Sequence, residues 1–323
     1  MSADDNSEAE AADCCSSCGK AEVDDTKLKQ CDGCDLVRYC GDECQANHRP
    51  DHEAACKERA AKLRDEILFK QPEGRHLGDC PICCLPHSVH INQSSLHQCC
   101  SKIICNGCSH ANLNAYLFER GGANIQRTCP FCRQPIPETM EEAVKFLMKR
   151  AERNDPVALR EFGRGLDGKI GDCDGAFAHF TEAAKLGDVD AHYLLSHLYV
   201  KGKGVEKDET KGLYHLEEAA IRGHSYARHN LACWDWENGQ HNRAVKHLII
   251  AANLGLDESI NGLKEYYKDG LVSKEDFAAA LRAHQAAVDA TKSPQREVAA
   301  KALSRSSNIG VISKEDFAAA LRA

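Results

Sequence analysis

The C-terminal half of the sequence has a pattern of apolar and polar positions that is typical of stacked helices. Two adjacent alanines, with a glycine three positions after the second, occur at Ala183–Gly187, Ala219–Gly223 and Ala251–Gly255. These copies are 36 and 32 residues apart, a period that indicates helical repeats. Small alanines let helices pack closely, and the glycine can adopt the left-handed conformation that ends a helix. The pattern predicts an all-α solenoid of four antiparallel helix pairs between about residues 155 and 292.

The segments around this solenoid are predicted from local pattern. Residues 57–71 place apolar side chains on one helical stripe, and Pro-Glu-Gly at 72–74 breaks the helix. We therefore expect a helix and linker at 57–79, a helical linker at 138–154, a disordered acidic N-terminus at 1–13 and a flexible tail at 293–323. The sequence SKEDFAAALRA occurs at 273–283 and again at 313–323. We assign no function to this second copy.

Composition divides the chain a second way, because 17 of its 19 cysteines lie between Cys14 and Cys132. The N-terminus has no apolar stretch for a signal peptide, and no run is long enough to span a membrane. We therefore expect a soluble protein of a reducing compartment, the cytoplasm or nucleus, in which paired cysteines bind metal. A formal net charge of −8 and only 6% aromatic residues argue against nucleic acid as a partner.

The first cysteine-rich segment, residues 14–56, contains four pairs of soft ligands. Two ligands separated by two or three residues can bind one tetrahedral Zn²⁺ ion, so four pairs suggest two ions. So short a segment cannot bury a sufficient core, and metal binding would supply its folding free energy. The pairs are Cys15 and Cys18, Cys31 and Cys34, Cys40 and Cys44, and His52 and Cys56.

This spacing, together with the Tyr39-Cys40 step, resembles the MYND-type zinc finger. The resemblance implies interleaved sites, with one ion on the first and third pairs and the other on the second and fourth. Cys14 is an alternative to Cys15, and His48 is a poorer alternative to His52. Family members often carry a tryptophan between the last two pairs, where this chain has QANHRPD. That absence leaves the metal sites intact but weakens the expectation of a peptide groove.

A second cysteine-rich segment, residues 80–137, again contains four pairs and predicts two further zinc ions. The order of the pairs, with a helix-like stretch before the last, resembles a RING finger that departs from the common pattern. The family's usual histidine position is Lys102, so we select the adjacent Cys99 and Cys100, with His97 and His110 as alternatives. The interleaving implied by the family would join Cys80, Cys83, Cys105 and Cys108 in one site, and Cys99, Cys100, Cys129 and Cys132 in the other.

The RING resemblance implies a ubiquitin ligase that positions a charged ubiquitin-conjugating enzyme rather than a protein with a nucleophile of its own. The matching contact positions are Ile82, Pro130 and Arg133. Tyr116, Leu117 or Phe118 would replace the helix tryptophan that the family often has. Each of these residues also has a plain structural interpretation. A non-enzymatic scaffold therefore remains the alternative function.

The helical repeats resemble the Sel-one-like branch of the tetratricopeptide class, most closely from Ala191 to Ala220. Such repeats imply a surface for partner proteins and no chemistry of their own. Candidates on that surface are His192, His197, His215, His224 and His229, although each is more simply a polar position on an amphipathic helix. The sequence as a whole predicts two zinc-stabilised cross-brace domains, a MYND-like one at 14–56 and a RING-like one at 80–137. The all-α solenoid at 155–292 follows them. Four zinc ions and protein partners are expected: a peptide ligand, a conjugating enzyme and a repeat-bound substrate.

Overall fold

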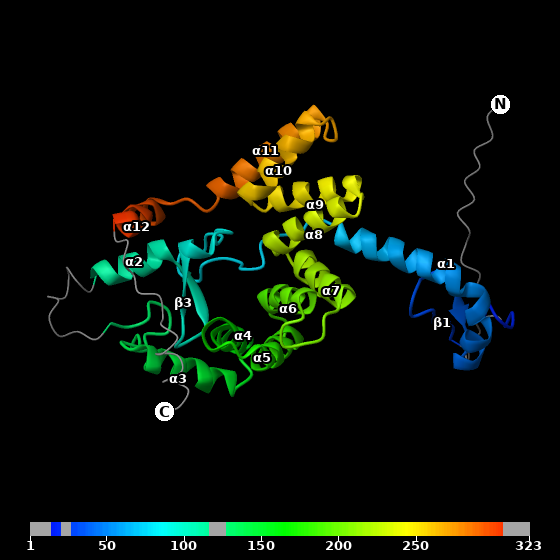
Figure 1. The fold of residues 1–323 in the computed structure, drawn as a ribbon, viewed down its shortest axis with the longest axis horizontal. Coiled ribbons are helices and arrows are strands. Elements are labelled where there is room, and N and C mark those ends of the chain that lie inside the picture. The colour runs from blue at the N-terminus through cyan, green and yellow to red at the C-terminus, as the bar shows by residue number, and fades with distance from the viewer. Residues whose placement is uncertain (1–13, 21–26, 116–126, 306–323) are drawn as a thin grey trace. The chain divides into compact units, whose positions relative to one another are not determined.

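The computed structural model describes residues 14–20, 27–115 and 127–305 (Figure 1). They divide into two compact units, the first ending at Lys70 and the second beginning at Gln71. Tyr116, Leu117 and Phe118, the acidic N-terminus and the second copy of the duplicated segment lie outside the described residues. No helix within the described ranges is long and apolar enough to cross a membrane.

The first unit consists of a short antiparallel ladder and one long helix. Strand β1 (Lys29–Gln30) pairs with β2 (Arg38–Tyr39), with Lys29 opposite Tyr39. Helix α1 then runs from Asp42 to Leu68, and it includes Pro50 in its interior. The apolar stripe in the sequence predicted this helix over residues 57–71. The earlier turns have no apolar stripe, and their inward face carries Cys44, His52 and Cys56 in place of hydrophobic residues.

The second unit begins with the other cysteine-rich module. A 3₁₀ turn, η1 (Ile91–Gln93), leads into β3 (Ser94–His97), which pairs antiparallel with β4 (Lys102–Cys105). Helix α2 (Asn106–Asn114) follows directly, and Cys105 is its N-cap. Helix α3 (Met140–Ala151) then packs against the first helix of the repeats.

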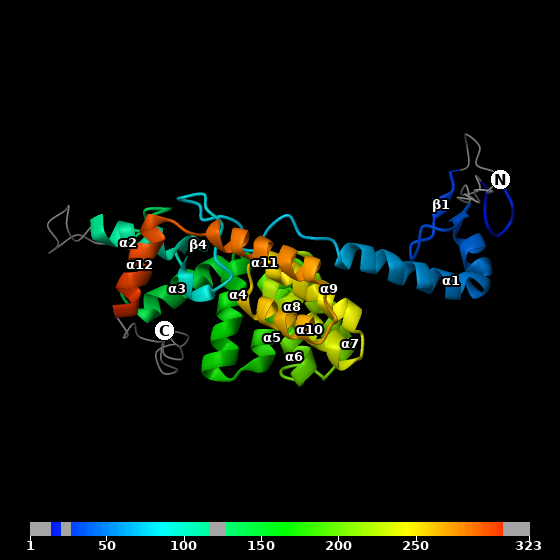
Figure 2. The same ribbon diagram turned by 90° about the horizontal axis from the view of Figure 1, so that it is seen from above.

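The repeats form the four helix pairs that the sequence predicts (Figures 1 and 2). Aspartate side chains cap the N-termini of several of these helices, as Asp188 does by accepting a hydrogen bond from the Ala191 amide. The pairs are α4 (Pro156–Gly165) with α5 (Cys173–Lys185), α6 (Val189–Lys201) with α7 (Glu209–Ile221), α8 (Ser225–Glu237) with α9 (His241–Asn253), and α10 (Asp257–Lys268) with α11 (Lys274–Asp289). A π-helical turn, η3 (Leu166–Ile170), connects the first two helices.

The core of the repeats is built from small and medium-sized side chains. Ala183, Ala219 and Ala251 are each fully buried, as their recurrence in the sequence suggested. Phe180 and Leu195 fill the core of the first repeats, and Leu248 and Leu263 fill that of the last ones. The cysteine-rich modules instead bury their own cysteines. This difference is expected between a module that is stabilised by metal binding and a domain that is stabilised by an apolar core.

The second cysteine-rich module is not separate from the repeats, although the sequence pattern suggested two domains. Arg75 donates hydrogen bonds to the carbonyl oxygens of Leu254 (2.7 Å), Ala287 (2.7 Å) and His87 (2.6 Å). Arg75 thereby joins α9 and α11 to the second cysteine-rich module, called the finger from here on. Gly223 lies so close to the linker that a β-carbon there would be 2.3 Å from the Gly74 carbonyl oxygen.

The tail also differs from its prediction, because residues expected to be flexible include helix α12 (Pro294–Arg305). This helix packs against α2 of the finger, beside it in both views (Figures 1 and 2). Its polar sequence concealed this role, since the face that it buries consists of little more than Ala299 and the stem of Arg296.

Candidate zinc centres

The first unit brings together two groups of four ligands. In one, the Sγ atoms of Cys18 and Cys40 are 3.6 Å apart and those of Cys40 and Cys44 are 3.5 Å apart. The fourth member is the buried Cys15 rather than its neighbour Cys14. In each group, all four ligand atoms lie within 4.8 Å of one another.

The other group of the first unit contains one histidine. His52 Nε2 lies 3.1 Å from Cys34 Sγ, and the Sγ atoms of Cys31 and Cys56 are 3.7 Å apart. His48 was the alternative ligand, and the structure places it elsewhere. Its Nδ1 lies 3.0 Å from the hydroxyl of the buried Tyr39, so it supports the ladder next to the site.

The second unit contains two all-cysteine groups. Cys80, Cys83, Cys105 and Cys108 form one, in which Cys83 Sγ lies 3.8 Å from Cys105 Sγ. The adjacent Cys99 and Cys100 both reach the other group, at 3.4 Å from Cys132 Sγ and 3.9 Å from Cys129 Sγ, respectively. His97 and His110 instead contact Ser109 and Asn114. Interleaving of this kind, implied by both resemblances, is therefore present in the geometry.

The dimensions of all four groups fit Zn²⁺. Tetrahedral bonds of about 2.3 Å from zinc to sulfur give sulfur–sulfur separations of about 3.8 Å. The nearest sulfur–sulfur separations run from 3.4 to 3.9 Å, and all ligand atoms of a group lie within 4.8 Å of one another. Soft thiolates with an occasional imidazole are the ligands that zinc prefers. That each of these side chains is a ligand stays a prediction.

Three of the ligand pairs share one backbone conformation. After the second cysteine of each pair comes a residue in the left-handed region: Gly19 (φ 72°), Cys84 (φ 53°) or Arg133 (φ 60°). The amide of that residue donates to the carbonyl of the first cysteine, at 2.8 Å for Gly19, 2.9 Å for Cys84 and 3.0 Å for Arg133. The turn directs backbone amides toward sulfur, as with Phe131 N and Cys129 Sγ at 3.4 Å.

The pKa values of the thiols show that the cysteines of a group cannot all ionise without a cation among them. Burial tends to raise the pKa of Cys15, but backbone hydrogen bonds from Cys18, Cys40 and Ser17 lower it to about 6. Hydrogen bonds with Cys44 and Cys18 raise the pKa of Cys40 to about 12. One thiolate thus suppresses ionisation of its neighbours. A bound Zn²⁺ would allow all the thiols of a group to ionise together.

The candidate conjugating-enzyme contacts lie on the two matching turns of the second module. Ile82 is 40% exposed and Pro130 is half-buried, while Arg133 is exposed. Phe131, which was not among the candidates predicted from the sequence, is 44% exposed and lies between Pro130 and the last ligand. The Lys102 ammonium lies 5.9 Å from the centroid of the Phe131 ring.

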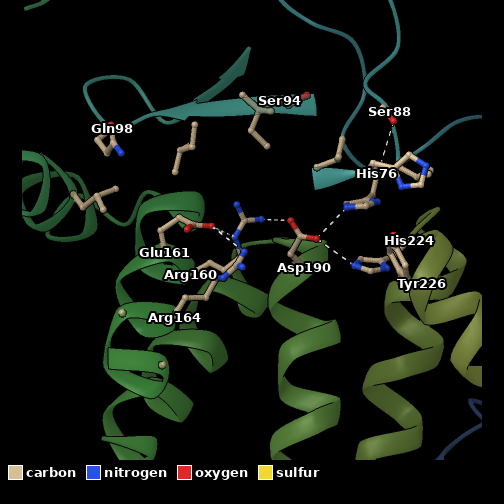
Figure 3. A pocket seen from close by; sticks show the side chains of 18 of the residues that line it. His76, Ser88, Ser94, Gln98, Arg160, Glu161, Arg164, Asp190, His224 and Tyr226 are labelled. Atoms are coloured by element: carbon tan, nitrogen blue, oxygen red, sulfur yellow. Dashed lines mark hydrogen bonds and ion pairs between the residues drawn. The ribbon is translucent and has the colours of Figure 1, made fainter. Parts of the chain in front are cut away.

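A further cluster contains His76, Asp190 and His224 (Figure 3). Both histidine Nε2 atoms approach Asp190 Oδ1, at 3.0 Å from His76 and 3.2 Å from His224, while Arg160 pairs with Oδ2. Burial tends to raise the pKa of Asp190, but these partners hold it well below its usual value. The cluster borders a cavity of about 630 Å³ between the finger and the repeats.

This cluster does not suit a metal ion. His224 Nδ1 accepts a hydrogen bond from the Ala227 amide at 3.1 Å, so its proton is on Nε2, where a metal would have to bind. The Arg160 guanidinium also occupies the carboxylate. His224 and His192, two candidates for the partner surface, are buried. The cluster is therefore a buried charge network that attaches the linker residue His76 to the repeats.

Comparison with known families agrees with this architecture. The family model of the MYND finger matches residues 15–56, and that of the Sel1 repeat matches 158–188, 189–224 and 225–256. The three Sel1 matches coincide with the first three helix pairs, α4 to α9. No curated protein matches the chain.

Two solved structures are among those similar to this chain. One is a Sel1 repeat protein from Oxalobacter formigenes, at 20% identity and a TM-score of 0.40 over 54% of this chain and 58% of that one. The other is c5321, a protective antigen of uropathogenic Escherichia coli strains displaying an SLR fold. It has 18% identity and a TM-score of 0.38 over 64% of this chain and 42% of that one. This chain thus matches less than two thirds of either protein. Its own modules, a MYND finger and Sel1 repeats, are those of a zinc-binding protein-interaction protein.

Proposed function

We propose that this protein is a RING-type ubiquitin ligase that recruits protein substrates through its MYND finger and its repeats. The second cysteine-rich module would bind a charged ubiquitin-conjugating enzyme and orient its thioester toward a substrate lysine. Its contribution would be positioning, which can supply several kcal/mol without a catalytic nucleophile.

The observation that carries this proposal is the exposed apolar pair Ile82 and Phe131. Each lies on the turn between two cysteines of a pair, and the two turns have the same backbone geometry. Large apolar side chains that a rigid turn holds in solvent are typical of a docking surface. Pro130 stiffens the second turn next to Phe131.

Arg133 would make the second contribution. It follows the last ligand, its side chain is exposed, and the left-handed turn fixes its backbone. A guanidinium is suited to bridging carbonyl groups of two partners, because its planar fork donates several hydrogen bonds at once.

Substrate recruitment would fall to the other modules. In the first unit, a groove of about 500 Å³ lies beside Cys31, His52 and Cys56, and its charged rim includes Arg49 and Glu53. A groove of this size accommodates a few side chains of an extended peptide. The repeats would hold a folded substrate. Both activities belong in the cytoplasm or nucleus, where thiols stay reduced and available to zinc.

The competing function is an adaptor without ligase activity. It is favoured by Lys102 at the position where the common RING has a zinc-binding histidine. In that case Lys102 and Phe131 would only cover the finger. The two functions differ in one measurable property, the discharge of ubiquitin from a conjugating enzyme.

The test is single-turnover discharge of ubiquitin from a panel of charged conjugating enzymes by the full-length protein. Ile82→Ala and Arg133→Ala should each lower the discharge rate at least about tenfold, because each removes a central contact. Zinc content, measured by native mass spectrometry, should stay at four ions in both variants.

Ile67→Ala is the matched control, since Ile67 is 53% exposed but belongs to α1 in the first unit, whereas both turns belong to the second. It should discharge ubiquitin at the wild-type rate. If the wild-type protein discharges no enzyme of the panel, or if Ile82→Ala and Arg133→Ala match the control, the ligase assignment is wrong and the adaptor function stands.

A further inference from the structure

Helix α12 follows the last repeat, yet its main contact is with the zinc module some two hundred residues earlier in the sequence. Its packing partner is α2, which begins between the third pair of cysteines. The contact is centred on Arg296, in the first turn of α12, whose amide is capped by Ser293 Oγ at 3.3 Å.

The Arg296 guanidinium is directed at the first turn of the zinc module. Nη2 donates to Cys83 Sγ at 3.4 Å and to the Leu85 carbonyl at 3.0 Å. Nη1 donates to the carbonyls of Pro86 at 2.6 Å and of Thr291 at 2.8 Å. Thr291 belongs to the connection that precedes α12. The guanidinium therefore connects α12 to Leu85 and Pro86, the two residues that follow Cys84.

The charges complement each other as well. Four thiolates around one Zn²⁺ leave a net charge of about −2 at this site. Every partner of the two terminal nitrogens of Arg296 is a carbonyl oxygen or a sulfur. Hydrogen bonds to a metal thiolate orient it and tune its bond to the metal, and losing such a partner typically weakens metal binding about 10- to 100-fold.

The close approach of α12 depends on a glycine between two predicted zinc ligands. Gly107 lies between Cys105 and Cys108, and a β-carbon there would be 2.9 Å from both the backbone nitrogen and Cγ of Arg296. The same zinc site therefore packs against the start of α12 at Gly107 and receives the Arg296 guanidinium at Cys83.

We propose that Arg296 is a positioning residue of the zinc site formed by Cys80, Cys83, Cys105 and Cys108. Through it, the C-terminal helix controls how firmly this one ion is held. The inference uses the metal site alone and does not depend on ligase activity. It also assigns a role to a segment that the family models do not match.

The experiment is a zinc-release assay on the full chain with a chromogenic chelator. In Arg296→Ala, one equivalent of the four should leave about 10- to 100-fold faster than in the wild type, while the other three keep their rates. Arg296→Lys keeps the charge and the fold but loses the planar fork, so it should release the same equivalent at an intermediate rate. Gly107→Ala should also accelerate that equivalent, because it displaces α12.

A second readout separates tuning of the thiolate from simple packing. In cobalt-substituted protein, loss of the hydrogen bond to sulfur should shift the sulfur-to-metal charge-transfer band to lower energy in Arg296→Ala. Lys301→Ala, an exposed position on the same helix, is the control and should change neither readout. If Arg296→Ala and Arg296→Lys release all zinc as Lys301→Ala does, with an unshifted band, the proposal is overturned.

Discussion

At the scale of single residues, a few long-range polar contacts hold the second unit together. Asp190 pairs with Arg160 of the preceding repeat and with His76 of the linker, while Arg75 reaches two different helices. The spacing of cysteines could predict the metal groups, because ligand pairs are local in sequence. It could not predict the long-range contacts of Arg75, His76 and Arg296, which join residues between 114 and 213 positions apart.

Replacing Asp190 tests this network. Asp190→Asn keeps the shape but leaves the Arg160 guanidinium, only 4% exposed, without its closest carboxylate. We expect the free energy of unfolding to fall by about 3 kcal/mol, as is usual for one partner removed from a buried ion pair. Urea denaturation followed by circular dichroism measures it.

Asp289→Asn is the control, because its pair with Lys292 is exposed and screened by solvent, so this substitution should leave the free energy of unfolding nearly unchanged. Equal effects of the two substitutions would show that the buried network does not stabilise the unit.

At the scale of elements, the alanine and glycine pattern predicted the helix pairs well, whereas α1 and α12 were harder to predict. The pattern works where helices bury alanine and leucine, as at Ala219 and Leu195. It fails where zinc ligands replace the apolar stripe, as in the first turns of α1, and where one arginine dominates the contact, as in α12. Between α6 and α7, the pattern also did not indicate the pairing of His192 with His215, whose Nδ1 atoms are 3.0 Å apart.

This histidine pair predicts a pH dependence of the stability of the repeats. Burial, reinforced by the neighbouring His192, lowers the pKa of His215 to about 4, below the value near 6.5 of an unfolded chain. The unfolded chain therefore binds more protons between these values. The stabilisation is complete above about pH 6.5 and is lost as the pH falls toward 4.

The measurement is the free energy of unfolding as a function of pH for the wild type, His215→Gln and Tyr214→Phe. His215→Gln should flatten the slope between pH 6.5 and 4, and the neighbouring Tyr214→Phe should leave it unchanged. A slope in His215→Gln as steep as that of the wild type would contradict the assignment.

At the scale of the whole molecule, the predicted order of a zinc-dependent N-terminal part followed by helical repeats is confirmed. The boundary between zinc-folded and core-folded parts is less sharp than the sequence suggests, because the second zinc module belongs to the same compact unit as the repeats. From the sequence alone, a chelator should unfold the zinc modules and leave the helices unchanged. The contacts of Arg75 and Arg296 alter that expectation.

Zinc removal should therefore affect particular helices. After treatment with a strong chelator, amide hydrogen exchange should accelerate in α1, α2 and α12 and at the C-terminal end of α11, where Ala287 accepts from Arg75. Helix α5, packed between α4 and α6, should keep its protection. Unchanged exchange in α12 and α11 would show that the finger and the repeats fold independently.

The linker that precedes the second cysteine-rich module contacts the repeats at separated points. His76 contacts Asp190 near the start of α6, and Arg75 contacts Leu254 after α9 and Ala287 near the end of α11. Arg296 of α12 contacts the module itself at Cys83. In a solenoid whose units contact only their neighbours, small rotations between units add up to large changes in curvature. Here the linker and α12 connect the second cysteine-rich module to the repeats from α6 to the end of α11, and so limit such rotations. A bound partner would therefore meet a surface of fixed curvature, and less of the binding free energy would be lost in bending the repeats to shape.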